Sequence, residues 1–255
     1  LLLLSRRFEN QRTSRFRTGV ALLMTLSLRK YKPDRGEAAT IPAVPASPTD
    51  AAIGAVKWLP GIDVPRLVGL MLLYFLATYV VLVVTFNLPF LMQHYTLSSS
   101  ASGVMISLFF LAIMLPGLFI TWIIRKLKNA TVFLPLLLIC AGLLLIYLFK
   151  YEWTIGLGCF VAGIGYGVIQ PLVYDKSVRT ADSKNTTLAL ALVMSVNYLA
   201  ILLCPFIVDL LTGLFGKSGS ADFPFVLNAA IVLLMAVVGY RYRESYVFGA
   251  PDFSE

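Results

Sequence analysis

Three amides inside long apolar stretches are the residues of this chain best suited to bind a small solute. Asn87, Gln170 and Asn197 are these amides, and Tyr166 and Tyr198 lie near two of them in sequence. A polar group in hydrocarbon costs free energy unless it is hydrogen-bonded, so these side chains should face protein or a water-filled cavity. For any single amide, a hydrogen bond between helices is the simpler interpretation. As a set, we interpret them as substrate-binding candidates that form a polar patch beside a cavity.

One carboxylate lies inside an apolar stretch. Asp209 has the residue type that carries protons or cations through membrane proteins, which makes it a proton-coupling candidate. It is near the end of its stretch, where lipid headgroups solvate a charge, and the interfacial interpretation is therefore favoured over the coupling one.

Residues for covalent or metal chemistry do not form a set. Cys140, Cys159 and Cys204 lie in three different apolar blocks without CxxC spacing, and His94 is the single histidine. The Gly216-Lys217-Ser218 run lacks the earlier glycine of a phosphate-binding loop. The sequence therefore predicts no enzyme, no cofactor and no metal site.

The composition indicates the class of protein that positions these residues. The 255 residues are 58% hydrophobic and 13% charged, whereas soluble domains average about 45–50% apolar and about 25% charged residues. Too little charge is present to cover a surface that faces water. The chain is predicted to be an integral, all-α membrane protein that contacts the lipid bilayer.

Six apolar stretches are long enough to cross about 30 Å of hydrocarbon as helices, which needs roughly 20 residues each. An even number of crossings places both ends of the chain on one side. The six predicted transmembrane helices are Leu67–Met92, Ala101–Ile124, Ala130–Phe149, Trp153–Tyr174, Leu188–Leu211 and Phe223–Tyr240.

The basic residues indicate which side that is. From Arg125 onward, eight of ten Lys and Arg residues fall in alternate connections and the tail, and Lys150 and Lys217 fall in the others. The positive-inside rule predicts cytoplasmic termini in the cell inner (plasma) membrane. The net charge of +8 is thus interpreted as a topology signal, and nucleic acid is not expected as a partner.

The chain is predicted to have three parts. Residues 1–65 form a basic cytoplasmic segment with a Pro-rich linker, residues 66–243 the six-helix bundle, and residues 244–255 a cytoplasmic tail.

The fourth predicted helix is rich in glycine. Gly163, Gly165 and Gly167 precede Pro171, although each glycine lowers helix stability by about 1 kcal/mol relative to alanine in water. Small residues on one face let a neighbouring helix approach closely, and a proline can bend a helix. Tight packing and bending during a transport cycle are both left open.

This region resembles the major facilitator superfamily of transporters. Gly163-x-Gly165-x-Gly167-x-x-x-Pro171, followed by a short basic loop with Lys176, Arg179 and Lys184, is similar to the family's tenth and eleventh helices. The stretch from Leu97 to Gly103 and the Arg125-Lys126-Leu127-Lys128 run resemble its seventh and eighth helices. The similarity covers about residues 65–243, which corresponds to the C-terminal six-helix half, and the N-terminal six helices are missing.

The resemblance implies two inverted three-helix repeats and a substrate path between two halves. It implies secondary active transport of a small organic solute by alternating access, as a symporter or antiporter driven by an ion gradient. Amides and aromatics favour a neutral or amphipathic small-molecule substrate, with export (efflux) as a candidate direction. The missing N-terminal half or a homodimer partner would complete the path. A non-transporting six-helix scaffold or regulatory fragment is the alternative.

Overall fold

The computed structural model describes residues 61–127, 130–217 and 219–249, which all belong to one compact unit, Ala55–Glu255. The predicted basic segment and Pro-rich linker lie almost wholly outside the described residues, as does Lys128 of the basic run.

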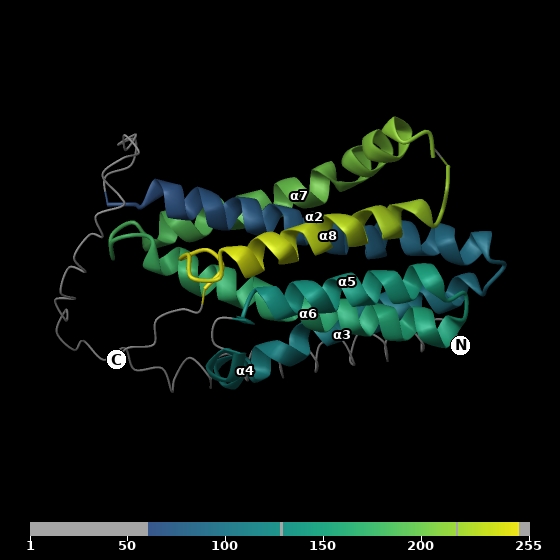
Figure 1. Ribbon diagram of the computed structural model, residues 1–255, viewed down its shortest axis with the longest axis horizontal. Helices are drawn as coiled ribbons and strands as arrows, with labels where there is room; N and C mark the ends of the chain where they lie inside the picture. The colour runs from purple at the N-terminus through teal and green to yellow at the C-terminus, as the bar shows by residue number, and fades with distance from the viewer. Residues whose placement is uncertain (1–60, 128–129, 218, 250–255) are drawn as a thin grey trace, which may run out of the picture. The chain divides into compact units, whose positions relative to one another are not determined.

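Seven helices make up the described part of the chain, in which no strand occurs (Figure 1). In chain order they are α2 (Val64–His94), α3 (Ser99–Leu118), α4 (Ile120–Leu127), α5 (Phe133–Leu148), α6 (Glu152–Arg179), α7 (Thr186–Leu214) and α8 (Phe223–Arg241).

The predicted all-helical membrane fold is confirmed. The helices α2, α3, α6, α7 and α8 are long and apolar enough to cross a membrane. The third predicted span, Ala130–Phe149, begins later than expected, because residues 130–132 are not α-helical and the corresponding helix α5 has 16 residues. At 1.5 Å per residue α5 rises about 24 Å, which is short of the about 30 Å of a typical hydrocarbon core.

The prediction of one continuous helix over Ala101–Ile124 is wrong. The first helix of this region, α3, ends at Leu118, and α4 begins at Ile120. Pro116 lacks a backbone donor and Gly117 is a weak helix former, so the helix is interrupted just after them. The eight residues of α4 are amphipathic, and Lys126 lies over the exposed Trp122 ring, 5.0 Å from its centroid. Helix α4 therefore has the character of an interfacial helix.

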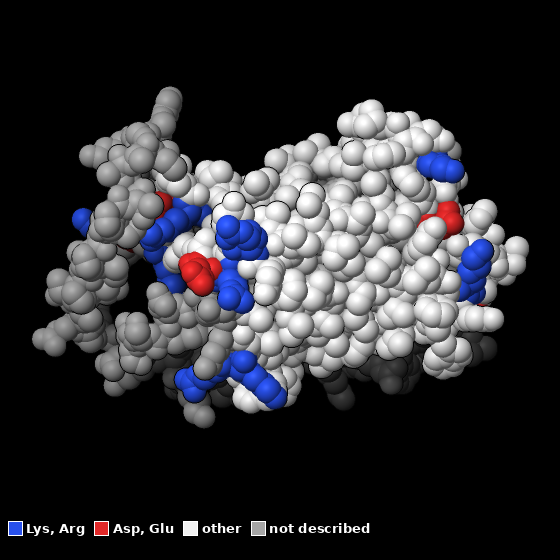
Figure 2. Space-filling model, viewed as in Figure 1, with Lys and Arg blue, Asp and Glu red and all other residues white. Residues whose placement is uncertain are grey.

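The connections between helices gather at two ends of the bundle. At one end, Lys150 lies over the Tyr95 ring at 4.9 Å, and the Ser98 amide donates to Glu152 Oε1 at 3.3 Å. At the other end, the Asp63 amide donates to the Thr180 carbonyl at 2.8 Å. Figure 2 shows an uncharged middle band with Lys and Arg side chains on either side of it, most of them at this second end. We call this second end the basic end.

The fourth predicted helix is longer than expected. Helix α6 continues to Arg179, so Lys176 and Arg179 lie in its last turns and not in a loop; Lys184 remains in the connection to α7. The reason is that the Lys176 ammonium is buried and fully hydrogen-bonded at this end of the bundle.

This topology predicts that Lys150 and Lys184 face opposite sides of the membrane. Both side chains are exposed, at opposite ends. With the three free cysteines replaced by alanine, a cysteine at either position should react with an impermeant maleimide from one side of sealed vesicles, and the sides should differ. Cysteines at Lys184 and Arg243 form the matched same-side pair. Labelling of positions 150 and 184 from the same compartment would contradict the helix order.

The packing partners fit two inverted three-helix repeats. Helix α6 packs against α3 and α5, α2 packs against α7 and α8, and α5 packs against α8. Exchanging α2 with α6, α3 with α7 and α5 with α8 converts each of these pairs into another of them or into itself. Such an exchange is what a pseudo-two-fold axis in the membrane plane produces.

The glycines of α6 sit where neighbouring backbones touch it. A Cβ added to Gly163 would lie 2.6 Å from the Phe109 carbonyl oxygen of α3, and one on Gly167 would collide with the Ile113 carbonyl. On another face, a Cβ on Gly165 would lie 2.6 Å from the Pro135 carbonyl oxygen of α5. Helix α6 runs through Pro171 without a break. The geometry therefore supports the packing interpretation of these residues.

Candidate functional site

Six neutral polar side chains from three helices meet inside the bundle. Tyr74 and Thr78 are one turn apart on α2, and Tyr166, Gln170 and Tyr174 follow at successive turns on one face of α6. Helix α7 supplies the sixth. We call this set the polar cluster: Tyr74, Thr78, Tyr166, Gln170, Tyr174 and Asn197.

Its first half joins α2, α6 and α7. The hydroxyls of Thr78 and Tyr166 are 2.8 Å apart and hydrogen-bonded. The amide oxygen of Asn197 accepts from Thr78 at 3.2 Å and lies 3.4 Å from the Tyr166 hydroxyl. One acceptor from α7 thus serves two hydroxyls from different helices.

The second half lies nearer the basic end. The hydroxyls of Tyr74 and Tyr174 are 2.8 Å apart, and Gln170 Nε2 donates to Tyr174 at 3.4 Å. The rings of Tyr74 and Tyr166 are nearly parallel, with centroids 6.4 Å apart, and Tyr174 meets Tyr74 edge to face at 5.5 Å. The three rings form a small aromatic group, two of them stacked and one edge-on, that carries three hydroxyls.

Burial gives the cluster one closed and one more open side. Tyr74, Thr78 and Tyr166 are buried, whereas Gln170, Tyr174 and Asn197 are half-buried. All six members are uncharged. Such a set can hydrogen-bond to hydroxyl, carbonyl or amide groups of a solute and can stack on a planar apolar part, but it offers no counter-charge to a carboxylate or an amine.

The structure brings together three of the five predicted substrate-binding residues. Tyr166, Gln170 and Asn197 belong to the polar cluster, whereas Asn87 and Tyr198 do not. Asn87 lies nine residues beyond Thr78, and at about 100° per residue this places it on the opposite face of α2. Tyr198 follows Asn197 on α7, and its side chain is 69% exposed.

The proton-coupling candidate also lies apart from the cluster. Asp209 is exposed on α7, within the last two turns of that helix. Its backbone carbonyl accepts from Thr212 Oγ1 at 3.1 Å.

Three members of the cluster escape a search by residue type. Tyr74, Thr78 and Tyr174 are common residues of apolar helices and attract no notice one at a time. Their signal is the spacing, because hydroxyl or amide side chains recur one turn apart on α2 and at three successive turns on α6.

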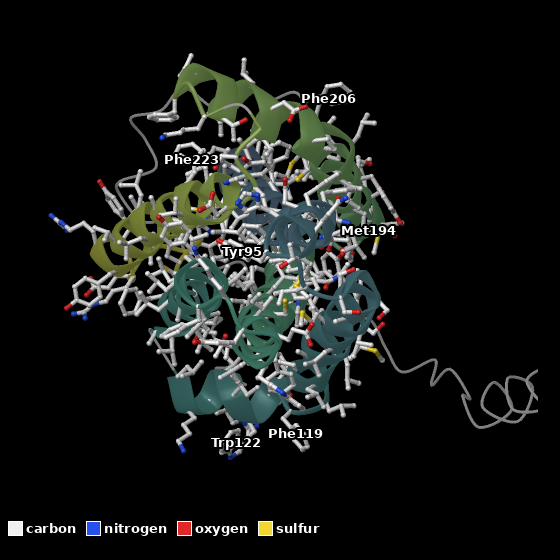
Figure 3. The ribbon with its side chains drawn as sticks, turned by 90° about the vertical axis from the view of Figure 1, so that its right-hand side faces the viewer. Tyr95, Phe119, Trp122, Met194, Phe206 and Phe223 are labelled. Atoms are coloured by element: carbon white, nitrogen blue, oxygen red, sulfur yellow. The ribbon has the colours of Figure 1, made fainter. Side chains whose placement is uncertain are left out.

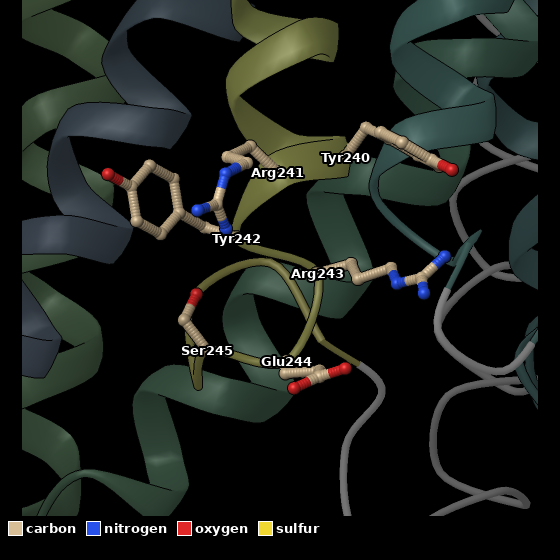
Figure 4. A pocket seen from close by; sticks show the side chains of 6 residues that line it. All are labelled: Tyr240, Arg241, Tyr242, Arg243, Glu244 and Ser245. Atoms are coloured by element: carbon tan, nitrogen blue, oxygen red, sulfur yellow. The ribbon is translucent and has the colours of Figure 1, made fainter.

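A surface hollow lies elsewhere, at the end of α8. Its volume is about 420 Å³, and both basic and acidic side chains line it (Figure 4). Its lining residues are Tyr240, Arg241, Tyr242, Arg243, Glu244 and Ser245. Within residues 61–127, 130–217 and 219–249, no group of three or more His, Cys, Asp or Glu side chains could hold a metal ion.

Comparison with models of protein families gives a match. The sequence model of the Major Facilitator Superfamily matches residues 16–205 and 70–251, and each of these overlapping stretches spans more than half of the chain. No curated protein matches it.

Proposed function

The chain belongs to the major facilitator superfamily, so it is a membrane protein that transports a solute, and we propose that it is a secondary active transporter of a small neutral or amphipathic organic solute. In this proposal the helices expose the polar cluster alternately to the two sides of the membrane. An ion gradient drives the cycle by symport or antiport, and export is the direction we favour.

The observation that carries this proposal is the polar cluster. Hydroxyls and amides from α2, α6 and α7 converge on one place, and none of them is charged. Helices α2 and α6 are also one of the three pairs that an inverted-repeat arrangement makes equivalent, and a transporter of this kind holds its solute where the two repeats meet. A solute that presents neutral polar groups and a planar apolar part matches these side chains.

The exposed faces of α3 and α7 support the proposal that another group of helices lines the other side of the substrate path. Large apolar side chains project from both helices, and Figure 3 shows Met194 and Phe206 of α7, with Phe119 and Trp122 beside and within α4, at the edge of the bundle. We propose that the other six-helix half, or a second copy of this chain, covers part of this surface and that lipid covers the rest. The basic end is proposed to face the cytoplasm of a cell whose plasma membrane holds the protein.

A non-transporting scaffold is the alternative function, and it has less support than transport. A non-transporting scaffold would also pair its buried amides with hydroxyls, as Asn197 does, so the hydrogen bonds alone fit both functions. Membership of a transporter family favours transport.

Asp209 is retained as the proton-coupling candidate because it is an acid within a membrane-spanning helix.

Loss of the cluster's hydrogen-bonding groups should weaken solute binding and so reduce solute accumulation. Thr78→Val and Asn197→Ala together remove the hydroxyl and amide shared by α2, α6 and α7. Leaving a buried solute group unpaired costs about 1–3 kcal/mol, so the apparent affinity should fall by a factor of about 5 to about 150. The measurement is uptake into membrane vesicles of a radiolabelled panel of polyols, neutral aromatic amphiphiles, monocarboxylates and amines.

A matched control uses the same helix. Ser195 is exposed on α7, and its hydroxyl donates to the Ala191 carbonyl of its own helix, so Ser195→Ala should leave uptake unchanged. Unaltered uptake in the double variant would remove the cluster as the binding site. Accumulation of only the charged solutes would contradict the substrate class, and no accumulation of any solute would favour the scaffold.

A further inference from the structure

A buried lysine fastens the segment after α8 to the bundle. Lys176 is 1% exposed, and its ammonium donates to three backbone carbonyls: Tyr246 at 2.9 Å, Val247 at 2.9 Å and Gly249 at 2.6 Å. A lysine has three N–H donors, so all of them are used. We call residues 246–249 the hook.

The hook is held in return by its own side chains. The Tyr246 hydroxyl donates to the Lys176 carbonyl at 2.7 Å. Burial raises the pKa of this phenol to about 12, so it keeps the proton that it donates at physiological pH. Lysine and hook are therefore joined by four hydrogen bonds, three of them charge-assisted and hence stronger than neutral ones.

The same hook contacts α2 and α8. The Arg66 guanidinium lies over the Tyr246 ring at 5.0 Å, and a Cβ on Gly69 would lie 2.8 Å from Val247 Cγ2. Phe248 packs on Gly239 of α8, where an added Cβ would lie 3.1 Å from its ring. A segment of four residues thus bridges three helices.

The position of this bridge relates it to the polar cluster. Along α6, Lys176 follows Tyr174 by two residues, and along α2, Gly69 precedes Tyr74 by five. The hook therefore ties α2 to α6 at the basic end, immediately beyond the Tyr74–Tyr174 hydrogen bond.

We propose that Lys176 is a positioning residue of the transport cycle: by binding the hook it keeps α2 and α6 together at the basic end, and the polar cluster opens toward that end only when the hook is released. The link to transport rests on the function proposed above. The structural part, that Lys176 holds the hook and the hook holds the helices, does not.

Cysteine labelling in permeabilised membranes tests both parts without a solute. In full-length chains that lack the native cysteines, a single cysteine replaces Val247 in the hook or the buried Val173 of α6. Lys176→Met removes every donor of the ammonium. Losing several hydrogen bonds should raise the population of the open segment, so maleimide should label position 247 about tenfold faster or more. Position 173 should also become reactive.

Further variants separate local release from general damage. Tyr246→Phe removes one hydrogen bond and should give an intermediate rate, which keeps the test available if Lys176→Met does not fold. Lys184→Met changes an exposed lysine at the same end and should have no effect. A chain that keeps only the buried native Cys159 reports global unfolding and should stay unlabelled.

The labelling rates test separately whether Lys176 holds the hook and whether the hook holds the helices. Unchanged labelling at position 247 in a folded Lys176→Met chain would overturn the role of the ammonium. Faster labelling at 247 with no change at 173 would show that the hook leaves without opening the buried core beside α6, which overturns the positioning role. Labelling of Cys159 as well would reduce Lys176 to a residue needed only for folding. Failure of the transport proposal would instead appear in the uptake panel, with hook labelling as expected here.

Discussion

Replacing Gly167 with alanine is expected to lower the free energy of unfolding by about 2–3 kcal/mol, the upper part of the range for overpacking. The added methyl group would collide with the Ile113 carbonyl of α3. This oxygen belongs to a helix backbone and cannot rotate away as a side chain can, so α3 and α6 must separate. Thermal unfolding in detergent, followed by the fraction of protein that remains monodisperse, is the measurement.

A matched glycine on α3 gives the opposite sign. Gly103 is also helical, and an added Cβ would meet no atom within 4 Å. Gly103→Ala should therefore leave stability unchanged or raise it, by up to about 1 kcal/mol from helix propensity. Equal stability of the Gly167→Ala chain and the unaltered chain would show that α3 and α6 tolerate a wider separation than the close contact implies.

The second large effect is expected at Tyr74. This side chain is fully buried between α2 and α6, and Tyr74→Ala leaves a cavity that a lipid environment does not refill. Loss of these packing contacts should cost about 2–4 kcal/mol in stability, somewhat less than the range for large aromatic residues in soluble cores, because no transfer from water is involved. The melting temperature should fall accordingly.

A conservative variant separates the ring of Tyr74 from its hydroxyl. Tyr74→Phe keeps the stacked ring and loses only the hydrogen bond to Tyr174, so its stability should fall by about 1 kcal/mol or less. The exposed Tyr198 provides the control, because Tyr198→Ala removes an equal side chain without creating a cavity. A Tyr74→Phe chain as unstable as Tyr74→Ala would mean that the hydroxyl, and not the packing of the ring, dominates.

The helices could be predicted from the sequence because hydrophobic length decides them. Most of the predicted stretches overlap a single helix closely, and Phe223–Tyr240 differs from α8 by one residue. The exception is Ala101–Ile124, since an average over an apolar stretch hardly registers Pro116 and Gly117. What ends α3 there is a local backbone property that hydropathy does not measure.

The end of α6 illustrates a second limit. From the sequence alone, Lys176 is expected outside the membrane-spanning part of the helix, because a lysine in an apolar helix is costly unless its donors are satisfied. Its three acceptors lie about 70 residues later in the chain, in a segment without a distinctive sequence. Only the folded structure shows that they meet.

Half of the members of the polar cluster could be predicted from the sequence, and the other half could not. Gln170 and Asn197 are conspicuous as amides among apolar residues, and both joined the cluster. Asn87 is equally conspicuous but faces another direction, because residue type says nothing about the side of the helix. Thr78 and Tyr74 were missed because only their spacing, combined with that of Tyr166 and Tyr174, distinguishes them.

The hook also bears on how the protein is made. A ribosome delivers Lys176 to the membrane 73 residues before Gly249, its last acceptor, so the nascent α6 carries an ammonium without its final partners while α7 and α8 are still being synthesised. Until then that end of α6 is held in water or headgroups more easily than in the bundle. Docking of the hook is thus a late event in biogenesis. A polypeptide that ends before the hook would leave Lys176 without its acceptors, and a cell's quality-control proteases would encounter α6 in that state.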